Sequence, residues 1–395
     1  MDQISYYFDN LQKTIQVHIY NMNSELISKD SSILEGNMLL ELSDQTAKDI
    51  VDDIINLFKN LKPFFMSKES SFLTRHYGTI FTKIQLELQN FFIFLNNHFL
   101  EYLDIVAKTT NKENFGSRFF LALTSVCLYI ESKGINQVVQ AMNEFMNTAK
   151  QGMHSHNIND HGFSIITSDL GKRIKEAAQK ILTVYTRMQS KTIEKMFRIG
   201  LDSTQNWLML KEPRDVRQVN DLVLDELVKL SGEITKLLPA TQALTTPNMQ
   251  RVGGGGGHNR TQSGNNDAMR RNTSATNLPS ATLFDKRMDV YSIVDFNANS
   301  ILVGIIKIAL KSYTECLRTK TFGTNGYHQI QVDLRFLRVY FTDMFGVQPT
   351  IDSLLQEADN TICDRCIDPI PLEESIIKKL SEDKFRSRKE EEKKA

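Results

Sequence analysis

The chain has 395 residues, and its 47 Lys and Arg residues balance 47 Asp and Glu residues, so the formal net charge at pH 7 is zero. This balance argues against a dedicated nucleic-acid-binding protein and against attraction of the whole surface to an anionic membrane, because both depend on excess positive charge. The chain contains only 19 Gly and 8 Pro, which favours long helices over a turn-rich β architecture.

The start of the chain and its cysteines indicate a cytosolic protein. The first residues lack the basic and apolar regions of a signal peptide, and no run approaches the roughly 20 apolar residues that span a bilayer. Free thiols are expected in such a reducing compartment, at Cys127, Cys316, Cys363 and Cys366. Any contact with a membrane is therefore expected to be peripheral.

Apolar residues recur at helical spacing through much of the first 239 residues. The residue at position 63 is a proline, which is expected to end the first strongly amphipathic helix. Lys133 and Gly134 are expected to separate two later helices, and 151–163 to form a polar loop. Helices are predicted over 44–62, 79–106, 117–131, 135–150 and 169–210.

The region 214–238 carries the most regular apolar pattern. Val216, Val219, Val223, Leu227, Leu230, Ile234 and Leu237 are separated by three or four residues. This near-heptad stripe suits packing against another long helix. Pro213 fits the first turn of this helix, and Pro239 stops it. The stripe is predicted to face the chain's own core, with a partner chain as the alternative.

Residues 240–283 differ in composition from both flanks. Gly253–Gly257 are consecutive glycines, and Asn, Ser and Thr dominate the rest. Such a segment buries too little apolar surface to offset the entropy lost on ordering, so a disordered linker is predicted. The glycine run is not followed by the Lys-Ser/Thr pair of a phosphate-binding loop. The linker divides a helical region, 1–239, from a second helical bundle, 284–381.

Helical patterns return after the linker. Asn299 or Ser300 is expected to cap a helix that runs to Lys320, and Thr350 another that runs to Arg365. Between them Asn325 and Gly326 are interpreted as an inter-helix turn, followed by a helix over 327–345. A short helix over 372–380 and a frayed, charged tail over 382–395 complete the predicted organisation.

Two local clusters resemble metal or redox motifs. Cys363 and Cys366 form a C-x-x-C, but a structural zinc site needs four ligands and no second pair stands nearby. Two cysteines at this spacing are interpreted as small residues on the inner face of a helix, with redox or zinc regulation as the alternative. His154, His156 and His161 are interpreted as part of a solvated loop rather than a metal site.

Motifs that carry catalysis are not found. The chain has no nucleophile elbow, kinase signature or dinucleotide fingerprint, so no enzyme activity and no cofactor are predicted. Arg270 and Arg271 precede Thr273 within the linker, which is a speculative phosphorylation site for a basophilic kinase. On residues alone, the sequence indicates an all-α scaffold without naming its partner.

Ordered sequence blocks on both sides of the linker resemble the C-terminal half of the Fat-free family. That family supplies the smallest subunit of the Golgi-associated retrograde protein (GARP) complex and of its endosomal recycling relative (EARP). The resemblance covers about residues 115–380. Its blocks are Tyr185–Gln189, Trp207–Arg217 (WLMLKEPRDVR), Asp289–Ser292, Phe296–Asn297, Gly304–Lys311, Glu315–Arg318, Thr321–Gly323, Gln329–Asp333 and Arg365–Glu373.

The resemblance implies a function and a fold. Members act in a tether that captures endosome-derived vesicles at the trans-Golgi network and promotes SNARE-mediated fusion. Implied partners are the other tether subunits, with SNAREs and small GTPases as further candidates, but no nucleic acid. The implied location is the cytoplasmic face of the trans-Golgi network and endosomes, and the cytosol. The implied fold is an elongated all-α helical rod of stacked helix bundles, interrupted here by the linker.

The resemblance also assigns structural roles to residues of the family motifs. The sequence alone also indicates a role for Trp207, because it is the only tryptophan and stands just before the helix start at Pro213: it is expected to anchor two helical segments, with Arg214 or Arg217 pairing with Glu212 or a helix end. The remaining motif residues are expected to be structural rather than catalytic or metal-binding. The full set comprises Trp207, Glu212, Pro213, Arg214, Arg217, Lys307, Glu315, Arg318, Phe322, Gly323, Gln331, Asp333, Cys366, Pro369, Pro371 and Glu373.

Two expectations concern assembly and alternatives. The family's N-terminal SNARE-contacting segment and coiled-coil section are not found here, so this chain is expected to bind the other tether subunits weakly. A subunit of another helical-rod tether, of the exocyst or conserved oligomeric Golgi type, would share the fold but show a different order of blocks. The sequence does not separate membership of GARP from that of EARP.

Overall fold

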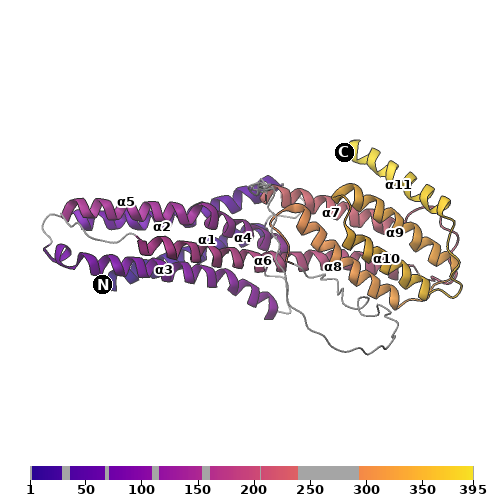
Figure 1. The fold of residues 1–395 in the computed structure, drawn as a ribbon, viewed down its shortest axis with the longest axis horizontal. Helices are drawn as coiled ribbons and strands as arrows, with labels where there is room; N and C mark the ends of the chain where they lie inside the picture. The colour runs from indigo at the N-terminus through magenta and orange to yellow at the C-terminus, as the bar shows by residue number, and fades with distance from the viewer. Residues whose placement is uncertain are drawn as a thin grey trace, which may run out of the picture. The chain divides into compact units, whose positions relative to one another are not determined.

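The regular structure of the described residues is helical throughout (Figure 1). The computed structural model describes residues 2–28, 36–66, 71–108, 115–153, 161–204, 206–238 and 293–394. Within these ranges the only β feature is an isolated bridge between Phe322 and Cys366. The predicted all-α class is therefore confirmed. The predicted linker, 240–283, lies outside the described residues.

The helices follow one another in chain order, most of them with amphipathic sequences. Their bounds are α1 (Asp2–Ser28), α2 (Gly36–Met66), α3 (Ser71–Lys108), α4 (Ser117–Tyr129), the π-helical turn η2 (Ile130–Gly134), α5 (Ile135–Met153), α6 (His161–Asp202), α7 (Gln218–Leu237), α8 (Ala298–Arg318), α9 (Thr324–Phe345), α10 (Pro349–Asp364) and α11 (Glu374–Lys394).

The first helices pack around α2, α3 and α4. Helix α2 lies against α1, α4 and α5, while α3 lies against α1 and α6. The stripe predicted in 79–106 forms the inner face of α3, where Ile84, Leu88, Phe91, Leu95 and Phe99 have no exposed surface. Hydrophobic burial of this kind supplies the main driving force for folding.

The later helices pack through α8, and α6 connects them with the first group (Figure 1). Helix α8 contacts α6, α7 and α10, and α9 contacts α10 and α11. Buried apolar residues from Phe8 to Ile377 form one continuous cluster. The stripe of 216–237 belongs to this cluster, because Val223, Leu227 and Ile234 are fully buried. It therefore faces the chain's own core, as predicted.

Several predicted boundaries in the first half are wrong. Pro63 lies inside α2, which continues to Met66. A proline in the last turn removes only a hydrogen bond near the end of the helix, so its cost there is modest. Lys133 and Gly134 do not separate two helices, because η2 joins α4 to α5 without interruption. Helix α6 ends at Asp202 rather than at 210.

The second half departs from the predictions at helix ends. Pro213 lies in the loop before α7, whose N-cap is Arg217. The cap of α8 is Asn297, whose side chain accepts a hydrogen bond from the Ser300 amide, and the N-cap of α10 is Gln348. Helix α9 begins at Thr324, so Asn325 and Gly326 lie in its first turn.

The charged tail is helical rather than frayed, since α11 extends to Lys394. Ion pairs between α11 and the neighbouring helices hold it, and they are described below. No helix among the described residues is both long and apolar enough to cross a bilayer.

Candidate functional site

Three loops meet beside the start of α9, and we call this meeting point the three-loop joint. The loops are 203–217 between α6 and α7, 319–323 between α8 and α9, and 365–373 between α10 and α11. The Gly323 amide donates to the Trp207 carbonyl at 3.1 Å, and the Phe322 amide to the Arg365 carbonyl at 3.0 Å. The Ile367 amide donates in turn to the Phe322 carbonyl at 3.0 Å. The middle loop is therefore bonded to both others.

Trp207 is the aromatic centre of the joint. Its side chain is buried, and its indole Nε1–H donates to the Leu201 carbonyl at 3.0 Å. Its ring meets that of Phe322 edge to face, with centroids 5.1 Å apart. This arrangement provides both apolar burial and a partner for the indole N–H, as a buried tryptophan requires. Trp207 thus links the end of α6 to the loop before α9, the anchor that the sequence predicts.

Two glycines allow the first loop to lie directly on the start of α9. A Cβ atom at Gly326 would stand 2.5 Å from the Trp207 carbonyl oxygen, and one at Gly323 would clash with the Leu208 carbonyl. The Asn325 side chain donates to the Leu210 carbonyl at 2.9 Å. Residues without a side chain are thus required where the two backbones touch.

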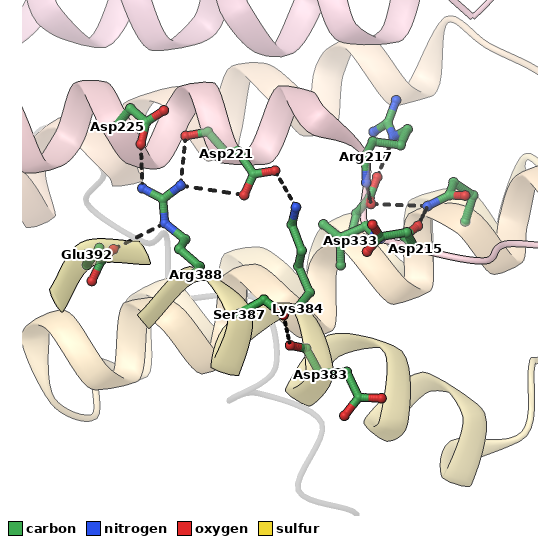
Figure 2. Close-up of polar contacts among 12 residues, drawn as sticks. Asp215, Arg217, Asp221, Asp225, Asp333, Asp383, Lys384, Ser387, Arg388 and Glu392 are labelled. Carbon is green, nitrogen blue, oxygen red and sulfur yellow. Dashed lines mark hydrogen bonds and ion pairs between the residues drawn. The ribbon is translucent and has the colours of Figure 1, made fainter. Parts of the chain in front are cut away.

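A buried ion pair joins the end of the first loop to α9 (Figure 2). The Arg217 guanidinium pairs with the Asp333 carboxylate, whose side chain is 1% exposed. The Arg217 amide also donates to Asp333 Oδ1 at 3.0 Å. The guanidinium lies 4.9 Å from the ring of Trp207 and donates to the Gly200 carbonyl at 3.1 Å. One side chain therefore connects α6, α9 and the Trp207 ring.

The electrostatics of this pair favour its charged form. Burial by itself lowers the pKa of Arg217, but the charge and hydrogen bonds of Asp333 and Tyr313 together outweigh burial and raise it. Tyr313 of α8 accepts a hydrogen bond from Arg217 at 3.4 Å. Burial raises the pKa of Tyr313 to about 12, so the phenol stays neutral. Gln329 completes the surroundings by donating to the Asp215 carbonyl at 2.9 Å.

The predicted partners of the motif arginines are partly wrong. Arg217 does pair with a helix end, at Gly200, but its carboxylate partner is Asp333 rather than Glu212. Glu212 and Arg214 are exposed in the loop. Asp333 lies 116 residues from Arg217 along the chain, so no local pattern indicates their contact.

The third loop is fastened mainly by backbone groups. Gln331 accepts a hydrogen bond from the Leu372 amide at 3.1 Å, and Thr324 donates to the Asp368 carbonyl at 3.2 Å. The His328 ring bonds the Ile370 carbonyl at 2.8 Å. Arg365 donates to the Lys320 carbonyl at 2.9 Å. The remaining motif residues of this segment, Pro369, Pro371 and Glu373, are exposed.

A second set of ion pairs, which we call the α11 latch, holds α11 against α7 (Figure 2). Arg388 pairs with Asp225 at 2.7 Å and with Asp221 at 3.5 Å. Lys384 pairs with Asp221 at 2.8 Å. Arg388 also lies 5.3 Å from the ring of Tyr340 on α9. The latch was not predicted from the sequence, because the charged residues 382–395 indicate a frayed tail when taken alone.

Three predicted residues, Lys307, Glu315 and Arg318, lie on α8. Lys307 is half-buried. Arg318 pairs with Glu315 one turn away and with Glu357 of α10 at 2.9 Å. These contacts fasten α8 to α10. The predicted phosphorylation site, Thr273, lies outside the described residues.

The cysteine pair is split between a helix and a loop. Cys363 belongs to α10, whereas Cys366 follows it in the bridge with Phe322, so the two do not share one helix face as predicted. All four cysteines are free thiols. Burial raises the pKa of Cys366, which disfavours the reactive thiolate.

Metal-binding groups are not assembled in the described part of the chain. No cluster of three or more His, Cys, Asp or Glu side chains stands at ligating distance there. His154 and His156 lie outside the described residues, and His161 is the first residue of α6. The polar groups of the three-loop joint instead bond one another, which is an arrangement that fixes helices.

The fold and the joint define an all-α helical protein, and similarity to known proteins gives its family. The chain is 50% identical over 402 residues to the vacuolar protein sorting-associated protein 51 homologue of Dictyostelium discoideum, covering 98% of this chain and 43% of that protein. The Arabidopsis thaliana homologue is 28% identical over 376 residues, covering 90% and 46%. The human homologue is 34% identical over 222 residues, covering 54% and 28%.

This chain belongs to the family of vacuolar protein sorting-associated protein 51 homologues, which is the family that the sequence blocks resemble. It spans less than half the length of these curated relatives. No family model and no solved structure matches the chain.

Proposed function

We propose that this chain is a non-catalytic part of a multisubunit tether that captures endosome-derived vesicles at the trans-Golgi network. In this role it acts in retrograde transport from endosomes to the Golgi, with endosomal recycling as a second route, and promotes SNARE-mediated fusion. The observation that carries the proposal is the 50% identity, over nearly the whole chain, to a protein named for vacuolar protein sorting.

The fold supports a structural role within such a complex. One apolar cluster runs through both helix groups. The polar groups of the three-loop joint form hydrogen bonds with one another. A helical body of this kind holds surfaces in fixed positions without needing a reactive side chain. The proposed location is the cytoplasmic face of the trans-Golgi network and endosomes, with the other tether subunits as partners.

A chimaera tests this proposal directly. The matched segment of the Dictyostelium relative is replaced by this chain, and the chimaera is expressed in cells that lack the relative. We expect the chimaera to purify with the other tether subunits and to restore intracellular retention of a vacuolar hydrolase. A chimaera without the segment provides the control. Normal abundance without either recovery would contradict the proposal.

A further inference from the structure

Four large apolar side chains are exposed at the three-loop joint. Their exposed fractions are 81% for Met209, 72% for Ile367, 57% for Ile370 and 49% for Leu208. Single exposed apolar residues are common on protein surfaces, but a cluster on well-ordered loops calls for a reason. These four come from two loops that are far apart in sequence and are held together by the middle loop.

The bridge geometry places the centre of this cluster on one face. Phe322 and Cys366 pair in parallel, so their side chains share a side, and the residues after them point to the opposite side. Ile367 therefore faces the same way as Gly323, and the Leu208 backbone covers Gly323 on that face. Leu208 and Ile367 are thus carried by neighbouring backbone segments, with Met209 next to Leu208 in the sequence and Ile370 three residues after Ile367.

Hydrogen bonds fix the loops that carry these side chains. The carbonyl of Leu210 accepts from Asn325, and that of Ile370 is bonded to His328. The Ile367 amide is bonded to Phe322. Loops that are already ordered lose little conformational entropy when a partner binds, which favours affinity.

The charges around the cluster indicate what kind of partner fits it. The exposed rim carries Lys211, Arg214 and Arg365 together with Glu212, Asp364 and Asp368. An anionic membrane would favour a purely cationic rim, whereas rims with both signs suit another protein surface. An apolar centre inside a polar rim is also the usual anatomy of a protein interface.

We propose that Leu208, Met209, Ile367 and Ile370 form a docking surface for another subunit of the tether. The partner presents an apolar recess bordered by charges of both signs. The four side chains are 49–81% exposed, and a group of exposed apolar side chains rimmed by polar residues marks an interaction site more often than scattered single ones do. This inference rests on the proposed function. It gives the helical body an assembly surface of its own, independent of the family's N-terminal coiled coil.

The test is co-expression of this chain with the remaining subunits of the tether. In the Met209→Asp, Ile367→Asp double variant, we expect recovery of partner subunits to fall at least tenfold, because two carboxylates would be buried in an apolar recess. Val347→Asp is the matched control, since Val347 is 73% exposed on the α9–α10 loop. It should recover partners like the wild type. Thermal unfolding should be unchanged in both variants.

The outcomes separate this inference from the proposed function. Equal recovery by the double variant and the wild type would overturn the docking surface and leave the tether role intact. No recovery by the wild type would also overturn the docking surface, whereas the tether role stands or falls with the chimaera described above. Two further results would also overturn the inference by naming another occupant. One is a wild-type dimer in light scattering that the double variant loses, and the other is variant-sensitive flotation with phosphatidylserine vesicles.

Discussion

The three-loop joint and the α11 latch use the same arginine–aspartate chemistry in different surroundings. At the joint, Asp333 is 1% exposed and accepts from both the amide and the guanidinium of Arg217. At the latch, Arg388 is buried but its partner Asp225 is 65% exposed. Water and salt therefore reach the carboxylate of Asp225 much more readily than that of Asp333. Because both sites pair an arginine with an aspartate, the expected difference in their contribution to the free energy of unfolding comes from burial.

The largest effect is expected from Asp333→Ala. This change leaves the Arg217 guanidinium buried without its counter-ion, which typically costs about 3–5 kcal/mol in the free energy of unfolding. Urea unfolding at two salt concentrations measures the loss. Because the site excludes solvent, the loss should be nearly the same at about 0.1 M and about 1 M salt.

A double-mutant cycle then isolates the pair. Asp333→Ala combined with Arg217→Ala should cost clearly less than the sum of the single changes, since the second change removes the stranded charge. Additive costs would mean that the two side chains act independently, and the contrast between joint and latch would lose its basis.

A second change probes the backbone contact at the joint. Gly326→Ala introduces a Cβ atom against the Trp207 carbonyl oxygen, and this overpacking should cost about 1–3 kcal/mol. Gly232→Ala is the control, because a Cβ at Gly232 in α7 meets nothing within 4 Å. That control should be neutral or slightly stabilising, as alanine favours helix. Equal thermal shifts in the two variants would show that the close approach is not rigid.

A substitution in the latch is expected to cost less stability than one at the joint, and this cost should depend on the salt concentration. Arg388→Gln removes the contacts to Asp221 and Asp225 and should cost about 1–2 kcal/mol at low ionic strength. Arg386→Gln is the matched control, because Arg386 is 70% exposed and pairs only with Asp383 one turn away. Hydrogen exchange of α11 amides should increase in the first variant alone. If the loss of stability is the same at about 1 M salt, the latch is shielded from salt like the joint, and the contrast between them is wrong.

The smallest effect on stability is expected from a partly buried carboxyl that belongs to neither the joint nor the latch. Burial raises the pKa of Asp359 on α10, and Arg338 offsets burial only in part. A raised pKa means that the folded protein binds this proton more tightly, so the stabilisation is full below the ordinary pKa of aspartate and is lost as pH rises. Asp359→Asn should therefore raise stability slightly at pH 7, with the gain shrinking towards pH 4. A pH-independent difference would exclude titration as its cause.

Features whose signal lies within a short stretch of sequence were predicted, such as the apolar face of a helix. The stripe of α7 was identified from its spacing, and burial of Val223 and Leu227 confirms it. Trp207 was also predicted to anchor two helical segments, from its place as the only tryptophan just before a predicted helix start, and its side chain is buried. In both cases the information lies within a few turns of the residue concerned.

Contacts between distant segments were beyond such patterns. Nothing near Arg217 indicates Asp333, and nothing in Asn325-Gly326 indicates that the glycine makes room for the Trp207 backbone. Helix α11 was misjudged for a related reason. Its composition is charged and poor in apolar residues, and its position depends on ion pairs with Asp221 and Asp225, more than 160 residues away.

The π-helical turn at Ile130–Gly134 has a consequence for how this chain tolerates changes in length. A π turn accommodates about one extra residue, and each residue rotates a helix by about 100°. The extra residue therefore resets the direction of the following face, so that α4 packs against both α2 and α6 while α5 packs against α2. Removing one residue here would leave both helices intact yet rotate the inward face of α5 by about 100° away from α2. This turn is thus a rotational offset on which the register of α5 depends.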